Sequence, residues 1–124
     1  MGIANARLAD AEALYASRRF ESASYLCGYA VELQLKAAIC QTLGWEGFPS
    51  SSREFESVRS FRTHDLDVLL SLTGREAEVL KDYTNEWEEV RSWNPETRYS
   101  PVGVVNEAQA SSMIRAAATL LRVL

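Results

Sequence analysis

The sequence predicts an all-α protein, an antiparallel four- to five-helix up-and-down bundle with a long loop between helices two and three. Apolar residues recur at intervals of three and four along most of the chain, and no stretch keeps the alternation of a strand for long. The chain has only six glycines and three prolines, so few residues interrupt helices. Its 124 residues match one domain with one core, which we expect to span residues 1–124.

The first helix is expected over residues 4–17. Small or apolar residues fall at helical spacing there and define an inner stripe: Ala4, Leu8, Ala11 and either Leu14 or Tyr15. Arg18 and Arg19 follow in the last turn or the connection, where positive charge suits the negative end of the helix dipole.

The second helix, over residues 20–43, is expected to be the central one. One seam steps by three and four residues, with small side chains at alternate positions: Ala23, Leu26, Ala30, Leu33, Ala37 and Cys40. A second stripe of Val31, Leu35 and Ile39 makes another side of the same helix apolar. A helix that is apolar on two sides needs neighbours on both, and Gly44 supplies its C-terminal stop.

The remaining side of this helix carries a polar strip of Tyr25, Tyr29, Glu32 and Lys36, beside Gly28. A glycine inside a helix costs about 1 kcal/mol relative to alanine, so it indicates close packing or access for a ligand. Glu32 and Lys36 form either an exposed pair four residues apart or part of a groove or dimer contact that also uses the two tyrosines.

The connection over residues 45–62 is longer than a compact bundle normally needs, and such loops are often functional or ordered by their own side chains. Its apolar residues favour the second explanation: Trp45, Phe48, Phe55, Val58 and Phe61. One short helix is expected around residues 53–59.

The third helix is expected to begin with Thr63 or His64 at its cap, to carry Asp65 and Asp67 in its first turn, and to end at Gly74. The fourth, over residues 75–92, ends before Pro95 and has a predicted inner face of Ala77, Leu80, Tyr83, Trp87 and Val90.

The last helix is expected over residues 107–123. Asn106, with Gln109 three residues later, resembles a capping box at its start. Its predicted inner face consists of Ala110, Ile114, Ala117, Leu121 and Leu124.

Composition narrows the functional classes. A net charge of −4 lacks the basic balance typical of nucleic-acid-binding domains. No apolar run approaches the roughly 18 to 20 residues that span a bilayer, and no secretory signal pattern opens the sequence, so we expect no membrane association and a cytoplasmic location. Cys27 and Cys40 lie about 20 Å apart along one helix, so we expect two buried, unpaired thiols. One histidine and two distant cysteines predict no metal site, and no cofactor is expected.

Four segments occur in a recognisable order: ASYLCGYAVELQLKAAI at 23–39, THDL at 63–66, RYSP at 98–101 and an alanine-rich terminal helix. Together they resemble the HEPN domain, a helical family named for nucleotide binding in higher eukaryotes and prokaryotes, over nearly the whole chain. The resemblance implies an antiparallel helical bundle, commonly a homodimer, often encoded beside a small nucleotidyltransferase. Some members of that family resemble ribonuclease toxins, and others bind nucleotides or partners.

The ribonucleases of that family carry an arginine followed a few residues later by a histidine. Arg59 and His64 have this spacing. However, Ser60 stands where the family has Asn, Asp or His, and the pair precedes the third helix rather than lying later in the chain. Arg98 lies in the later region, but no histidine follows it. The resemblance therefore implies the fold and does not by itself imply the nuclease.

His64 is the only histidine of the chain, and three roles remain open for it: a cap of the third helix, a ligand contact, or a catalytic group. Metal-independent cleavage of RNA needs a group that moves a proton from the 2′-hydroxyl and a cation that stabilises the charge on the phosphorane. His64, together with Arg59, Arg62 or Arg98, could supply both.

Two functions are consistent with these residues. In the first, a homodimeric binding module recruits a nucleotide or a small nucleotidyltransferase in a toxin–antitoxin type of system. Its candidate binding residues, besides His64, are Tyr25, Tyr29, Glu32, Lys36, Asp65, Arg98 and Tyr99. In the second, the protein is an enzyme, a metal-independent endoribonuclease toxin that uses His64 with Arg59 or Arg98 in a cleft between protomers.

Overall fold

The structure, a computed structural model, describes residues 2–51, 53–56, 58 and 62–124. Every regular element in these residues is a helix, which confirms the all-α class. The elements are α1 (Ile3–Ala16), α2 (Phe20–Leu43), α3 (Leu66–Leu72), α4 (Glu76–Asp82), α5 (Thr84–Val90), the 3-10 helix η2 (Pro95–Tyr99) and α6 (Glu107–Val123). None of these helices combines the length and the apolar character that a bilayer-spanning segment requires.

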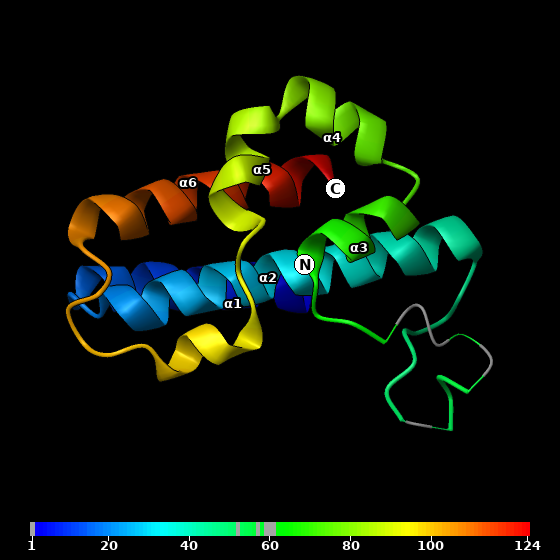
Figure 1. Ribbon diagram of the computed structural model, residues 1–124, viewed down its shortest axis with the longest axis horizontal. Coiled ribbons are helices and arrows are strands. Elements are labelled where there is room, and N and C mark those ends of the chain that lie inside the picture. Colours follow the sequence, from blue (N-terminus) through cyan, green and yellow to red (C-terminus); the bar gives the residue numbers. More distant parts are fainter. Residues whose placement is uncertain (1, 52, 57, 59–61) are drawn as a thin grey trace.

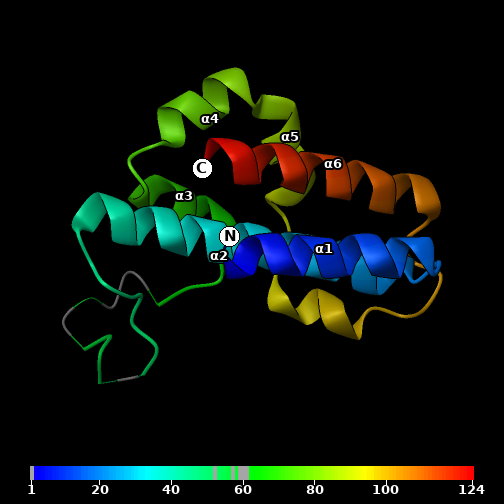
Figure 2. The ribbon, with the colours of Figure 1, turned by 180° about the vertical axis from the view of Figure 1, so that it is seen from behind.

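Three long helices, α1, α2 and α6, lie side by side, and the shorter helices α3, α4 and α5 pack around them (Figures 1 and 2). Helix α1 runs antiparallel to α2, whereas α6 runs in the same direction as α2 (Figure 1). This differs from the strict alternation of an up-and-down bundle. The reason is that the segment containing η2 returns the chain to the end of the molecule where α2 begins.

Helix α2 is the centre of the fold, as predicted, because α1, α6, α3 and η2 all pack against it. Its predicted stripe of Val31, Leu35 and Ile39 is fully buried. The other predicted seam is buried at Ala23 and Ala30 but not farther along, because Ala37 is exposed. A straight helix drifts by about 20° per heptad relative to a repeat of 3.5 residues, so by Ala37, two heptads after Ala23, the seam has turned by about 40° away from the core.

Helix α1 matches its prediction closely. Ala4 and Ala11 are buried against α2 and α6, and Leu8, Leu14 and Tyr15 are half-buried. Both alternatives for the last position of the stripe therefore contact the rest of the protein.

The predicted fourth helix is wrong as a single element, because it is broken at Tyr83, whose backbone leaves the helical region at φ −130° and ψ 37°. The hydroxyl of Thr84 donates a hydrogen bond to the carbonyl of Leu80, so a side chain takes the acceptor that a continuing helix would use. The break rotates α4 relative to the prediction. Val79 is buried, whereas Leu80 and Ala77 are exposed.

The capping box of α6 is confirmed by two reciprocal hydrogen bonds between Asn106 and Gln109, at 2.8 and 2.9 Å. The inner face is confirmed only in part. Ala110 and Ala117 are buried, but the other buried positions were not predicted: Met113, Ala116 and Leu120. The face is wider than one stripe because α6 packs against α1 and α2 and also against α5.

The long connection is ordered by its own aromatic side chains in the part that the structure describes. The rings of Trp45 and Phe48 lie 6.2 Å apart, and those of Phe48 and Phe55 lie 6.0 Å apart. Residues 53–56 form turns rather than the predicted helix over 53–59. Phe61, also predicted to belong to this cluster, lies outside the described residues.

The two cysteines are unpaired, as predicted, but only Cys27 is buried, whereas Cys40 is partly exposed. Burial raises the pKa of the Cys27 thiol to about 12 and also raises the pKa of Cys40. Because only the thiolate reacts, we expect a disulfide reagent at mildly alkaline pH to label Cys40 slowly in the native protein, faster as the pH rises, and Cys27 only after unfolding. Absorbance measurements on Cys40→Ser and Cys27→Ser check this. Native-state labelling that survives in Cys40→Ser would contradict it.

Candidate functional site

The carboxylate of Glu32 is the centre of the polar strip on α2. Glu32 is only 1% exposed, although it lies in the middle of a helix surrounded by apolar residues. Its Oε2 accepts hydrogen bonds from Lys36 Nζ at 2.8 Å and from His64 Nδ1 at 2.7 Å. A buried carboxylate needs such partners, because burial without them is costly. The pair of Glu32 and Lys36 is therefore part of a larger cluster and is not a simple surface pair.

His64 reaches this cluster from the segment that leads into α3. A carboxylate oxygen can only accept, so Nδ1 carries the hydrogen and Nε2 remains for another partner. The imidazole side chain is 62% exposed. Glu32 thus fixes the ring from inside the protein while the rest of the ring faces outward. An imidazole oriented by a carboxylate can bind a phosphate or exchange a proton.

A hollow of about 520 Å³ adjoins this cluster. Its described lining consists of Lys36, Phe48, Pro49, Ser50, Phe55, Arg62, Thr63 and His64. Lys36 Nζ lies 5.1 Å from the centre of the Phe48 ring, and the guanidinium of Arg62 lies 5.9 Å from the centre of the Phe55 ring. Each of these two cations therefore lies over an aromatic ring.

Of the two tyrosines in the strip, Tyr25 lies nearer the start of α2 and contacts Trp93. Tyr25 stacks on Tyr29 at 6.4 Å, and the rings of Tyr25 and Trp93 are 5.8 Å apart. The indole of Trp93 also covers Gly28, where an added Cβ would lie 2.2 Å from the ring. The glycine is therefore required for packing, which was one of its two predicted reasons.

Arg98 and Tyr99 lie at this same end. Arg98 Nη2 donates to the Tyr99 hydroxyl at 3.0 Å, and hydrogen bonds to Tyr99 and then Tyr25 raise the pKa of Arg98. Tyr25 precedes Glu32 by seven residues, or about 10 Å along the helix axis. Arg98 and His64 line different hollows, and these two hollows have no lining residue in common. One protomer therefore does not bring this predicted pair together.

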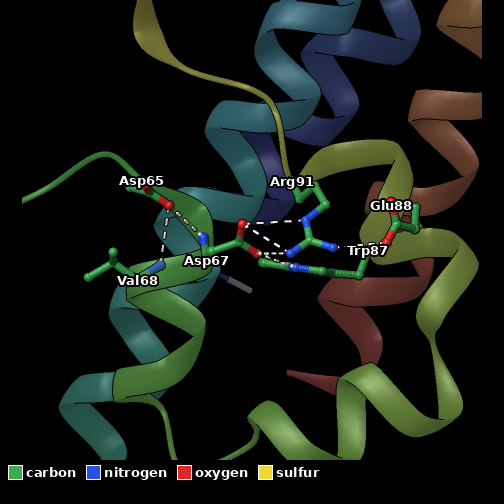
Figure 3. Close-up of polar contacts among 6 residues, drawn as sticks. All are labelled: Asp65, Asp67, Val68, Trp87, Glu88 and Arg91. Carbon is green, nitrogen blue, oxygen red and sulfur yellow. Dashed lines mark hydrogen bonds and ion pairs between the residues drawn. The ribbon is translucent and has the colours of Figure 1, made fainter.

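Asp65 and Asp67 have structural partners. Asp65 is the N-cap of α3, and its Oδ1 accepts from the backbone N–H groups of Asp67 and Val68, so the predicted caps Thr63 and His64 are wrong (Figure 3). The Asp65 carboxylate is a charged acceptor, which suits the N-terminus of a helix. Asp67 joins α3 to α5 through Trp87 Nε1, at 2.8 Å, and through Arg91 (Figure 3).

Arg59, the predicted catalytic partner of His64, lies outside the described residues. Phe48 and Phe55 were predicted to order the loop but not to line a site, and Arg62 was predicted only as one possible cation. Their signal in the sequence is an aromatic-rich loop that ends in an arginine two residues before His64. Within the described residues, no three His, Cys, Asp or Glu side chains come together as a metal site.

Comparisons of the chain with protein families, with curated proteins and with solved structures found no match.

The cluster predicts an unusual tautomer of His64. In the neutral form of the ring, we expect the hydrogen on Nδ1, because Glu32 accepts it. A long-range proton–nitrogen correlation spectrum identifies the tautomer directly. Glu32→Ala should move the hydrogen to Nε2, and Glu46→Ala, which alters an exposed carboxylate near the loop, should not. An Nε2 hydrogen in the unaltered protein would contradict this geometry.

Proposed function

We propose that the chain is a HEPN-like, nucleotide-binding helical module that acts as a homodimer with a small nucleotidyltransferase as partner, in a toxin–antitoxin type of system. The observation that supports this proposal best is the buried carboxylate of Glu32, which holds Lys36 and His64 at the edge of an open hollow. The same three residues fall within the segments that resemble the HEPN domain.

The chemistry of the hollow suits a nucleotide. Lys36 and Arg62 offer hydrogen-bond donors to phosphate oxygens, and His64 adds a donor at Nε2 when its ring is protonated. Phe48 and Phe55 supply the apolar part of the wall beside these cations. The carboxylate of Glu32 is buried beneath these side chains and holds Lys36 and His64 in place. The surface of the hollow that faces solvent therefore presents cations rather than this carboxylate.

A titration with a fluorescent ATP analogue tests this site. Lys36→Ala should weaken binding about tenfold, because it removes one charge-assisted contact to phosphate. Lys81→Ala removes the only other lysine, on the exposed side of α4, and should leave the affinity unchanged. Equal affinities of the two variants, or no binding by the unaltered protein, would count against the proposal.

A second candidate function is the metal-independent cleavage of RNA. The observation that favours it is the orientation of His64, because a carboxylate on Nδ1 leaves Nε2 as a base that faces outward. Total RNA incubated with the protein under chelation provides the test. Cleavage that His64→Ala abolishes and Glu86→Ala does not would favour the enzyme over the binding module.

The oligomeric state and the partner need separate measurements. In light scattering, the average molar mass should rise with concentration in the micromolar range, toward the mass of a dimer. A monomer mass at all concentrations would count against the dimer. Co-expression with an adjacent nucleotidyltransferase, where the genome encodes one, tests the partner by copurification.

A further inference from the structure

We propose a second ligand site, separate from the His64 hollow, which binds a small phosphate ester whose body carries hydrogen-bond donors. It lies where the turn between α1 and α2 meets η2. Two adjoining hollows of about 280 and 270 Å³ form it, and they share Glu21, Tyr25, Thr97 and Ser100 in their walls. None of the residues that line it also lines the His64 hollow.

Three arginines line the outer hollow: Arg18, Arg19 and Arg98. Their charges are only weakly compensated. Arg18 lies 3.9 Å from Glu107, and Arg98 donates to a tyrosine hydroxyl rather than to a carboxylate. Glu21 is the acid in this wall, and its Oε2 already accepts from the backbone N–H of Val105. A protein with a net charge of −4 thus places three positive charges around one hollow, which suits a phosphate.

The backbone at this point is held in an uncommon conformation. Arg18 has φ 61°, and it is the one non-glycine residue with positive φ in the described ranges. Such a conformation costs of order 1 kcal/mol or more for a residue with a Cβ. Hydrogen bonds from Arg18 N–H to the Tyr15 carbonyl and from Arg19 N–H to the Leu14 carbonyl hold the turn. The turn sends α2 back along α1 and brings both arginine side chains to the edge of the hollow.

The inner hollow is lined by acidic rather than basic side chains. Its wall has the carboxylates of Glu21 and Glu89 and no basic side chain among the lining residues. Thr97 Oγ1 and the indole N–H of Trp93, both in residues of this wall, are buried and have no hydrogen-bond partner in the part of the chain that the structure describes. Unpaired buried polar groups are costly, so a molecule that pairs with them gains affinity.

The two hollows together define the class of ligand. An anionic end fits the arginines, and an end that donates hydrogen bonds fits the carboxylates. Hydroxyl groups satisfy both requirements of the inner wall, because they donate to Glu89 and can also accept from Thr97. The ring of Tyr25, which lines both hollows, offers an apolar face between the two ends. A phosphorylated sugar, free or as part of a nucleotide, has this combination.

Calorimetric titration with ribose 5-phosphate tests the proposal. We expect binding, and we expect Arg19→Gln and Arg98→Gln each to weaken it about tenfold. Arg115→Gln removes an exposed arginine of α6 that lines none of the hollows described above, and should change nothing. Thr97→Val, which keeps the shape of the side chain, should weaken binding as well. Arg19 is exposed, so its variant stays folded even if Arg98→Gln does not.

Two further ligands separate the parts of the proposal. Phenyl phosphate has the anionic end without donors and should bind about tenfold more weakly than ribose 5-phosphate. AMP shows whether the phosphorylated sugar is part of a nucleotide. An affinity for AMP well above that for ribose 5-phosphate identifies a nucleotide as the ligand, and an equal or lower affinity identifies a free sugar phosphate. No binding of ribose 5-phosphate at about 10 mM, equal binding of phenyl phosphate, or unchanged affinity in both Arg19→Gln and Arg98→Gln would each overturn the proposal.

Discussion

Gly28→Ala is expected to destabilise the protein by about 3 kcal/mol or more, because the added methyl group would enter the indole ring of Trp93. An ideal Cβ at this position lies 2.2 Å from two ring atoms, closer than any real contact, and Trp93 is only 6% exposed, so it has little room to move. Alanine is the better helix former by about 1 kcal/mol, so a helix without this contact would be stabilised by the same change. Urea denaturation followed by circular dichroism measures the difference.

Two companion variants identify the cause. Gly47→Ala should change the free energy of unfolding by less than about 0.5 kcal/mol, since an added Cβ there meets nothing within 4 Å. In a Trp93→Leu background, Gly28→Ala should cost much less than in the unaltered protein, because the ring that it would strike is gone. Equal costs in both backgrounds would show that the loss does not come from this contact.

Asp67→Ala is expected to lower the free energy of unfolding by about 2 kcal/mol, because it leaves the indole N–H of Trp87 buried without an acceptor. Trp87 is completely buried, and its Nε1 donates to Asp67 Oδ1 at 2.8 Å. Arg91 also loses a partner, but it keeps Glu88 at 2.8 Å (Figure 3). Most of the cost therefore comes from the indole and not from the partly exposed ion pair.

A double-mutant cycle separates these two contributions. Trp87→Phe removes the N–H group and keeps an aromatic ring, so Asp67→Ala should cost clearly less in that background. Asp82→Ala, at an exposed carboxylate of α4, serves as the control and should stay within about 0.5 kcal/mol of the unaltered protein. Additive effects of Asp67→Ala and Trp87→Phe would mean that the hydrogen bond contributes little.

Both predictions concern contacts that sequence patterns did not identify. Gly28 was recognised as an exception within a helix, but its partner Trp93 is 65 residues away in the chain, and the periodicity of α2 does not indicate which side chain covers the glycine. Asp67 was placed correctly in the first turn of α3 on the basis of the helix dipole. Its hydrogen bond to Trp87 depends on how α3 packs beside α5, which is a property of the assembled fold.

For the candidate site, the sequence likewise identified residues but not their tertiary contacts. The polar strip of α2 follows from steps of three and four, and the sequence alone singles out Glu32, Lys36 and His64. Whether Glu32 is buried or exposed cannot be read from that spacing, because an acid four residues before a lysine also forms an ordinary ion pair on an exposed helix surface. The cleft predicted to hold Arg98 and His64 was one between protomers, and within one protomer the two residues line separate hollows.

The sequence by itself determined the helical class, the bounds of α1, α2 and α6, the central place of α2 and the capping box of α6. These features depend on the spacing of apolar residues and on hydrogen bonds between residues close in the chain, so local physics is sufficient to predict them. Only the tertiary structure decided the break at Tyr83, the direction of α6 relative to α2, the burial of Glu32 and the contact of Trp93 with Gly28. Each of these depends on which distant surfaces meet, and the free energy of that packing outweighs the small local preferences that a sequence pattern records.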